Sequence, residues 1–164
     1  MSLFHICQFP DPVLRKVSKP VIQIDSDIRS FVKSLIAFMR AQPGGVGIAA
    51  PQVGVLKRIA VVDLSRKVAG SEQLILINPE IISQTGFTLS REGCMSLPDY
   101  TANVSRAAEI ILRWQDLDLN VQERHMVDLE ARCVQHEVDH LNGFLFVDRV
   151  SSIKGDVYRR KRYL

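Results

Sequence analysis

Residues 136–140 read His-Glu-Val-Asp-His, and both histidines can serve one metal ion only if this run is helical. In a helix, side chains at positions i and i+4 lie one turn apart on the same face, so His136 and His140 can reach a common ion. Glu137 lies about 100° around the helix, where it can reach a water molecule on that ion without being a ligand. The run therefore predicts a helix with a metal-dependent hydrolytic site. Two histidines that only form hydrogen bonds on a helix face are the alternative interpretation.

A catalytic metal site needs a third protein ligand and an open position for water. Cys133 shares the helix face, but it lies seven residues before His140, about 10 Å along the axis, which a cysteine side chain does not span. We therefore interpret Cys133 as a thiol that packs beside the site. Cys94 is the remaining candidate, because Gly93 before it and Ser-Leu-Pro shortly after it predict a loop that presents its thiolate and the next backbone N–H. One cysteine and two histidines suit zinc or ferrous iron.

Residues 45–52, Gly-Val-Gly-Ile-Ala-Ala-Pro-Gln, match the G-x-G-x-x-A pattern of dinucleotide-binding proteins, and Asp63 follows at a fitting distance in sequence. That pattern should follow a strand and open a helix, whereas here it follows a helical segment and Pro51 interrupts it. We therefore reject dinucleotide binding. Instead we expect a small-residue strand or loop over which a substrate backbone can lie, ending in Gln52, whose amide can donate to an oxyanion.

The pattern of apolar residues predicts two helices and several strands. Residues 25–40 have apolar side chains at three- and four-residue steps, which is typical of an amphipathic helix. A second helix runs from Asp128, a suitable N-cap, to about residue 141. Runs rich in Ile, Val and aromatic residues predict strands at 58–64, 74–77, 80–83, 104–114 and 120–126. This order predicts an α+β fold, with mostly antiparallel sheets packed around a central helix that carries H-E-x-x-H and with an N-terminal amphipathic helix.

The length of 164 residues suits a single catalytic domain, 1–164, with one hydrophobic core. The net charge of +3 is concentrated in a short basic C-terminal tail, 151–164, which we expect to be solvated, with a ribosome contact left open. The rest of the chain is nearly neutral, which disfavours DNA as a partner. No apolar run has the length of a membrane span, and the N-terminus lacks a secretory apolar region, so we expect a cytoplasmic protein.

Three blocks, in this order, resemble the peptide deformylase family: residues 45–52, residues 92–96 and residues 135–143. The likeness extends to 9–16, 77–80 and 145–149, so it covers nearly the whole chain up to about residue 150. H-E-x-x-H alone indicates only a metallohydrolase, whereas the three blocks together are highly specific. The resemblance implies metal-dependent hydrolysis of the N-formyl group from the N-terminal formyl-methionine of nascent polypeptides, with release of formate.

The resemblance also implies the metal site and the partners. Cys94, His136 and His140 would hold one divalent metal ion per chain. Ferrous iron is the ion implied in the cell, and zinc, nickel and cobalt are alternatives. The implied partner is a formyl-methionyl nascent peptide, acted on by a monomer, without DNA or a membrane.

The family's catalytic and substrate-binding roles fall on residues of the three blocks and of the second helix. Glu137 would take a proton from water and pass it to the leaving amine. The amide of Gln52 and the backbone N–H of Met95 would hold the oxyanion, and Gly47 would meet the substrate backbone. The pocket for the methionine side chain would be lined by Val46, Leu129 and Cys133. One departure is Asp128, which stands where glycine is common in the family.

Two rival functions stay open on the sequence alone. The first is an H-E-x-x-H metallopeptidase that cleaves internal amide bonds, although many such enzymes place their third ligand downstream of the histidines rather than at an upstream Cys94. The second is a non-catalytic or altered-substrate relative of the deformylases, whose metal stabilises a fold that binds nascent chains or ribosomes. Glu137 argues against a non-catalytic role, because a structural metal site needs no general base.

Overall fold

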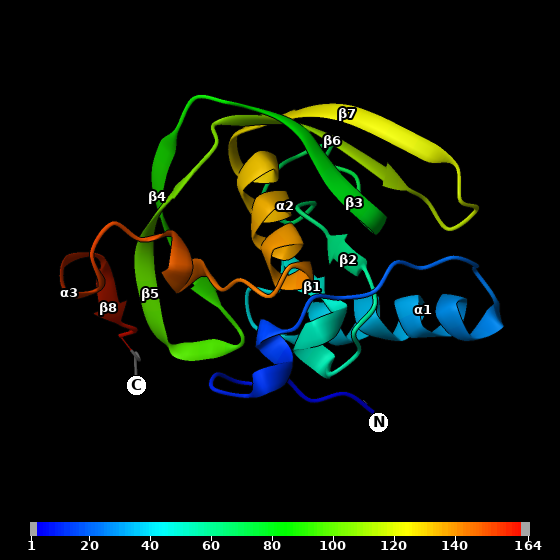
Figure 1. Ribbon diagram of the computed structural model, residues 1–164, viewed down its shortest axis with the longest axis horizontal. Helices are drawn as coiled ribbons and strands as arrows, with labels where there is room; N and C mark the ends of the chain where they lie inside the picture. The colour runs from blue at the N-terminus through cyan, green and yellow to red at the C-terminus, as the bar shows by residue number, and fades with distance from the viewer. Residues whose placement is uncertain (1–2, 162–164) are drawn as a thin grey trace.

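The computed structural model describes residues 3–161 and contains two antiparallel sheets beside a central helix, α2 (Figure 1). One sheet has the order β1–β2–β3–β6–β7, with β1 Gly47–Ala49, β2 Ile59–Val62, β3 Leu74–Thr85, β6 Glu109–Gln115 and β7 Val121–Val127. The other has the order β4–β5–β8, with β4 Thr88–Cys94, β5 Leu97–Arg106 and β8 Val157–Arg159. The helices are α1 Ser26–Ala41, α2 Asp128–Leu141 and α3 Ile153–Asp156, with 3-10 helices η1 Pro12–Arg15, η2 Ala50–Val53 and η3 Phe146–Arg149. The predicted α+β class with antiparallel sheets is confirmed.

Helix α1 covers one side of the five-stranded sheet. Asp25 caps it by accepting a hydrogen bond from the backbone N–H of Ile28 at 2.9 Å. Its apolar residues recur at helical spacing and are buried against β1 and β2; they include Ile28, Val32, Leu35 and Met39. This packing holds the short strand β1 in place, and β1 forms one wall of the site described below.

Helix α2 is buried over most of its length. Ala131, Val134, Val138 and Leu141 join a core cluster with residues of β2, β3 and β6. The predicted side-chain cap by Asp128 is wrong: Val127 occupies the N-cap position, and no side chain caps the helix. Asp128 instead has φ +52°, in the left-handed region that favours glycine. The local backbone therefore explains why glycine suits this position.

The predicted strand at 104–114 is also wrong. The chain breaks there into β5 and β6, because it passes from one sheet to the other at Ala107 and Ala108. The side-chain amide of Gln135, on α2, holds this crossing: it accepts from the N–H of Ala107 and donates to its carbonyl, both at 3.0 Å. A run of strand-forming residues carries no signal for such a tertiary contact.

The two strands predicted at 74–77 and 80–83 form one continuous strand, β3. Its register shifts between Ile77 and Glu80, and Asn78 has φ +50°. The Asn78 side chain exchanges two hydrogen bonds, both at 2.8 Å, with the backbone of Val21. The strand therefore continues through a bulge, which the Asn-Pro sequence made look like a break.

Asp63, the candidate ribose ligand of the rejected dinucleotide motif, has a structural role. It is 7% exposed and accepts hydrogen bonds from the hydroxyl of Ser65 at 2.6 Å and from the guanidinium of Arg40 at 2.9 Å. These two interactions hold the pKa of the Asp63 carboxyl well below its usual value. The carboxylate therefore joins α1 to the loop after β2.

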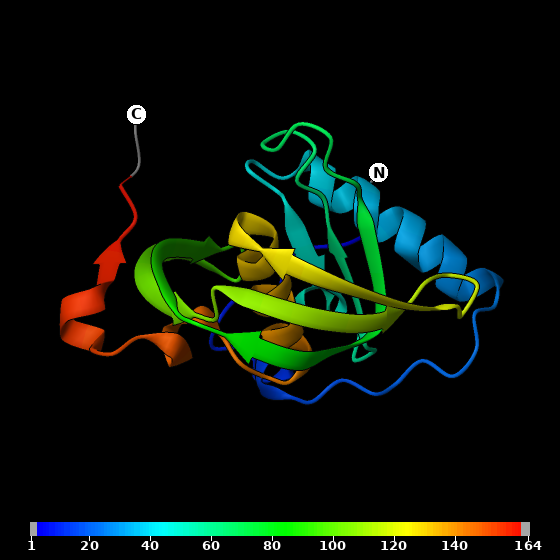
Figure 2. The ribbon, with the colours of Figure 1, turned by 90° about the horizontal axis from the view of Figure 1, so that it is seen from above.

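The basic C-terminal segment is partly built into the fold. Strand β8 adds to the edge of β5, with Ala102 opposite Val157 and Tyr100 opposite Arg159. In Figures 1 and 2 this segment lies outside β5, at the end of the molecule away from α1. Arg162, another residue of the predicted solvated tail, lies outside the described residues. No helix within residues 3–161 is both long and apolar enough to cross a membrane.

A buried charge cluster joins the three-stranded sheet to α2. Arg106, at the end of β5 and 5% exposed, donates to both carboxylate oxygens of Glu92 on β4, at 2.6 and 2.9 Å. Its remaining nitrogen donates to Asp139 on α2 at 2.9 Å. Asp139 also binds Arg149 of η3 at 2.8 Å. One arginine therefore fixes the position of two strands relative to the helix.

Replacing Arg106 with leucine should destabilise the protein strongly, because Glu92 and Asp139 would remain buried without this partner. We expect Arg106→Leu to lower the free energy of unfolding by about 3–5 kcal/mol, as measured by urea titration. The control is Arg113→Leu, because both members of the Arg113–Glu123 pair are half exposed and such pairs contribute at most about 1 kcal/mol. Equal losses in the two variants would contradict the structural role of Arg106.

Candidate active site

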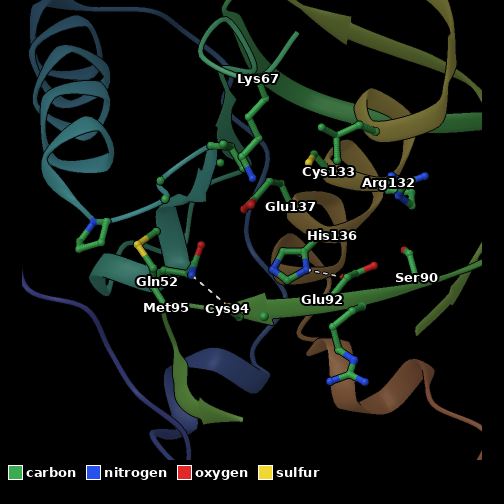
Figure 3. A pocket seen from close by; sticks show the side chains of 18 of the residues that line it. Gln52, Lys67, Ser90, Glu92, Cys94, Met95, Arg132, Cys133, His136 and Glu137 are labelled. Atoms are coloured by element: carbon green, nitrogen blue, oxygen red, sulfur yellow. Dashed lines mark hydrogen bonds and ion pairs between the residues drawn. The ribbon is translucent and has the colours of Figure 1, made fainter. Parts of the chain in front are cut away.

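Two of the three predicted metal ligands, Cys94 and His136, line a pocket of about 380 Å³ between β1, β4 and α2 (Figure 3), and the third, His140, lies beside them. One ligand atom from each of Cys94, His136 and His140 lies within 4.8 Å of the others. Helix α2 presents the two histidines one turn apart, with ring centroids separated by 5.0 Å. Cys94 is the last residue of β4, and its Sγ lies 3.3 Å from Nε2 of His140. The loop predicted around Cys94 is a tight turn, Met95-Ser96, between two strands.

Glu92 orients His136. Its Oε1 lies 2.9 Å from Nδ1 of the imidazole, so the Nδ1–H donates to the carboxylate and Nε2 is left for a metal ion. The pKa of His136 is held well above its ordinary value: burial opposes the charged ring, but the adjacent Cys94 and Glu92 outweigh burial. The Phe146 ring stacks on His136 at an interplanar angle of 18°. The His136 ring is therefore held at its edge by Glu92 and on its face by Phe146.

The chemistry of these donors fits a divalent transition metal. Burial alone would raise the pKa of the Cys94 thiol, but His140 and His136 hold that pKa well below its ordinary value, as a thiolate ligand requires. One thiolate and two imidazoles suit zinc or ferrous iron, and three protein ligands leave a position open. Cys133 lines the same pocket, but burial and the charge of Glu137 raise the pKa of its thiol to about 12. Cys133 therefore remains a neutral thiol beside the site.

Glu137 points into the pocket from α2 (Figure 3). It is 5% exposed, and its Oε2 has no hydrogen-bond partner within residues 3–161. Burial raises the pKa of this carboxyl, although the two histidines partly offset the effect. A buried carboxylate oxygen without a partner costs stability, which makes this side chain a candidate for a chemical role.

Gln52 lies on η2 and is 1% exposed. Its side-chain oxygen accepts from the backbone N–H of Ala49 at 3.0 Å, which turns the amide nitrogen toward β4. That nitrogen lies 3.2 Å from the Ser96 hydroxyl and 3.5 Å from Cys94 Sγ. The amide is therefore an oriented donor beside the predicted metal ligands. Met95 and the expected substrate-contacting residues line the same pocket: Val46, Gly47, Leu129 and Cys133.

Several residues that shape the site were not predicted to do so. Glu92 was quoted only as part of a motif, although a strand prediction for β4 would have placed it on the same face as Cys94, two residues later. Lys67, Arg132 and Arg160 also line the pocket. They come from a loop, a helix and the C-terminal segment, and no spacing in the sequence connects them.

The sequence of the described region matches one family. Residues 3–156 match the family model of polypeptide deformylase. The peptide deformylase of Acidobacterium capsulatum is 41% identical over 161 residues, covering 98% of this chain and 94% of that protein. The chain belongs to the peptide deformylase family. The peptide deformylase of Alkalilimnicola ehrlichii is 43% identical over 161 residues, with coverages of 98% and 89%.

Solved structures of peptide deformylases share the fold. One from Synechococcus elongatus in complex with actinonin has a TM-score of 0.86 at 35% identity, covering 94% of this chain and 82% of that chain. The structure from Thermotoga maritima has a TM-score of 0.84 at 37% identity, with coverages of 91% and 98%. The predicted family and activity, metal-dependent hydrolysis of the N-formyl group of formyl-methionyl peptides, are confirmed by this membership.

Gly47 has no space for a side chain. A β-carbon at this position would lie 2.5 Å from Oε1 of Glu137. We expect Gly47→Ala to displace that carboxylate and to lower kcat/KM for a formylated peptide about 10- to 100-fold, because small misplacements of a reacting group are costly. Gly155→Ala is the control, since its β-carbon would meet only ordinary contacts, the nearest at 3.5 Å. Full activity of a folded Gly47→Ala variant would contradict the tight approach of β1 to Glu137.

Proposed function

We propose that Cys94, His136 and His140 hold one divalent metal ion, and that Glu137 moves the proton in the hydrolysis of formyl-methionyl nascent peptides. The observation that carries this proposal is the buried Glu137 carboxyl group, which lines the pocket beside the three ligand atoms and has one oxygen without a hydrogen-bond partner within residues 3–161. A site with only a structural metal needs no such group. The chain would work as a single catalytic domain, 1–164, as a monomer in the cytoplasm, where nascent chains are made.

The donor set is compatible with several divalent transition metals. Ferrous iron is our proposal for the ion in the cell, and zinc, nickel and cobalt are ions that the same ligands accept. A divalent ion held there supplies a Lewis acid that makes water more acidic and polarises the formyl carbonyl. The Glu92 carboxylate would keep His136 in the tautomer that presents Nε2 to the ion.

Glu137 would act first as a base and then as an acid. One carboxylate oxygen would take a proton from the water molecule that attacks the formyl carbon. The same carboxyl would then give that proton to the methionine nitrogen as the C–N bond breaks, which leaves a free amine and formic acid, which ionises to formate in solution. Burial raises the pKa of this carboxyl, which makes it a stronger base for the first proton transfer.

Two fixed donors would stabilise the charge that develops on the formyl oxygen. The Gln52 amide is pre-oriented by its bond from Ala49 and lies beside Cys94. The backbone N–H of Met95 follows Cys94 in the tight turn between β4 and β5. Such donors act on the transition state at no reorganisation cost, since the fold holds them already in place.

The apolar part of the pocket would receive the methionine side chain. Val46, Leu129 and Cys133 are half-buried and pack against the main core cluster, so their positions are fixed by that core. The neutral Cys133 thiol suits an apolar contact with a thioether. Gly47 would lie along the substrate backbone at the edge of β1.

The role of Glu137 is tested by formate release from formyl-Met-Ala-Ser with protein purified without oxygen and loaded with iron(II) or nickel. We expect Glu137→Ala to lower kcat about 10²- to 10⁴-fold, the usual contribution of a general base, while metal content stays at one ion per chain. The control is Glu130→Ala on the same helix, because Glu130 pairs with Arg124 and does not line the pocket.

The same assay separates the rival functions. Retained formate release by metal-loaded Glu137→Ala would contradict the proposed proton transfer. Cleavage of an internal peptide bond in a non-formylated peptide would favour a general metallopeptidase. Metal-dependent folding without hydrolysis of any peptide would favour a binding role.

A further inference from the structure

The mouth of the catalytic pocket is lined by basic residues. Lys67, Arg91, Arg132 and Arg160 all line it, from four separate segments of the chain. None of these four side chains forms an ion pair in the part of the chain that the structure describes. A peptide that leaves the pocket therefore passes an excess of positive charge.

The acidic residues of the pocket do not neutralise this charge. They are Glu92 and Glu137. Glu137 is buried beside the metal ligands, and Glu92 is occupied by Arg106 and His136. The four basic side chains therefore make the electrostatic potential at the pocket mouth positive. A carboxylate on the substrate would be attracted to that potential.

Arg160 is the cation that the fold places most specifically. Its backbone N–H donates to the carbonyl of Asp99 at 2.8 Å, which extends the pairing of β8 with β5. Tyr158 pairs with Thr101 of β5, and Thr101 pairs with Gly93 of β4. Side chains two residues apart share one face of a strand, so Arg160 lies on the face of Tyr158 and can reach across Thr101 toward β4.

Gly93 receives the Arg160 side chain. A β-carbon at residue 93 would overlap Nη2 of Arg160, so the guanidinium lies directly against the bare backbone of Gly93. Gly93 precedes the metal ligand Cys94 on β4, an edge strand that lines the pocket. The adjacent Arg91 stacks on the Tyr158 ring at 3.9 Å, which holds β8 against the same face. The guanidinium of Arg160 therefore lies one residue along β4 from Cys94, on the strand face of Arg91 rather than on the face of Glu92 and Cys94.

We propose that Arg160 is a specificity-determining residue that favours formylated peptides with an acidic side chain at one of the two positions after formyl-methionine. This proposal rests on the proposed function, because it takes the formyl group to lie at Cys94, His136 and His140. An extended peptide advances about 3.3 Å per residue, and a peptide that leaves the pocket along β4 would bring these two positions to the guanidinium.

The test compares matched peptides that differ by one charge. The substrates are formyl-Met-Glu-Ser and formyl-Met-Gln-Ser, with formyl-Met-Ala-Glu and formyl-Met-Ala-Gln for the next position, all amidated at the C-terminus. We expect the metal-loaded protein to show a kcat/KM about two- to five-fold higher for Glu than for Gln at one of these positions, the range for an exposed ion pair. The difference between the Glu and Gln peptides should lie in KM. It should shrink at 0.5 M salt, because the screening length, about 10 Å at 0.1 M, is then about half as long and weakens the attraction between exposed charges.

The variants isolate Arg160. Arg160→Gln should reduce the Glu/Gln ratio to about one and leave turnover of the Gln peptides unchanged. Arg160→Lys should keep part of the preference, because it keeps the charge. The matched control is Arg159→Gln, which removes the neighbouring charge from the opposite face of β8; Arg159 does not line the pocket, so the ratio should persist.

The outcomes distinguish the two levels of the proposal. Equal kcat/KM for Glu and Gln peptides in an active protein would overturn the specificity role and leave the proposed function standing. An unchanged Glu/Gln ratio of kcat/KM in Arg160→Gln would also overturn the specificity role. Weaker ribosome binding by that variant would not rescue this role, because Arg160 would then contact RNA rather than the peptide. Absence of formate from all four peptides would overturn the proposed function and this inference together.

Discussion

The buried arginine at the end of β5 is the interaction on which the site geometry depends. Arg106 holds Glu92 of β4 and Asp139 of α2, and these elements carry the proposed metal ligands. Glu92 then uses the same carboxylate to fix the ring of His136. Buried ion pairs are a weak source of stability compared with well-packed apolar side chains. We infer that this cluster persists because it sets the distance between strand and helix and the direction of one ligand.

The Glu137 carboxylate, our proposed general base, shows a related compromise between stability and function. Glu137 is buried with one oxygen that has no hydrogen-bond partner within residues 3–161, and β1 approaches it so closely that a β-carbon at position 47 would displace its carboxylate. A folded protein tolerates such a local cost when the surrounding core is well packed. Here α1 packs on β1 from one side, and the core cluster around α2 holds the helix from the other. The packing around β1 and α2 therefore keeps the Glu137 carboxylate buried although its burial costs stability.

The sequence predicted what local spacing encodes and missed what tertiary contacts decide. The i, i+4 spacing of His136 and His140 predicted a helix, which is α2, and elimination among the cysteines predicted Cys94, which lies beside both histidines. The strand at 104–114 was wrong because Gln135, on a distant helix, holds the crossing between sheets. The Asp128 cap was wrong because that residue takes a left-handed backbone. Arg160 reaches the pocket only through the pairing of β8 with β5, for which residues 151–164 carry no signal beyond their charge.

The coordination by Cys94, His136 and His140 is tested most directly by X-ray absorption at the zinc edge of protein loaded with one zinc ion per chain. The proposed ligands predict one sulfur at about 2.3 Å and two imidazole nitrogens at about 2.0–2.1 Å, with a light atom in the fourth position. The sulfur contribution should disappear in Cys94→Ala and persist in Cys133→Ala. A spectrum without sulfur, or one that loses it in Cys133→Ala, would contradict the proposed metal site.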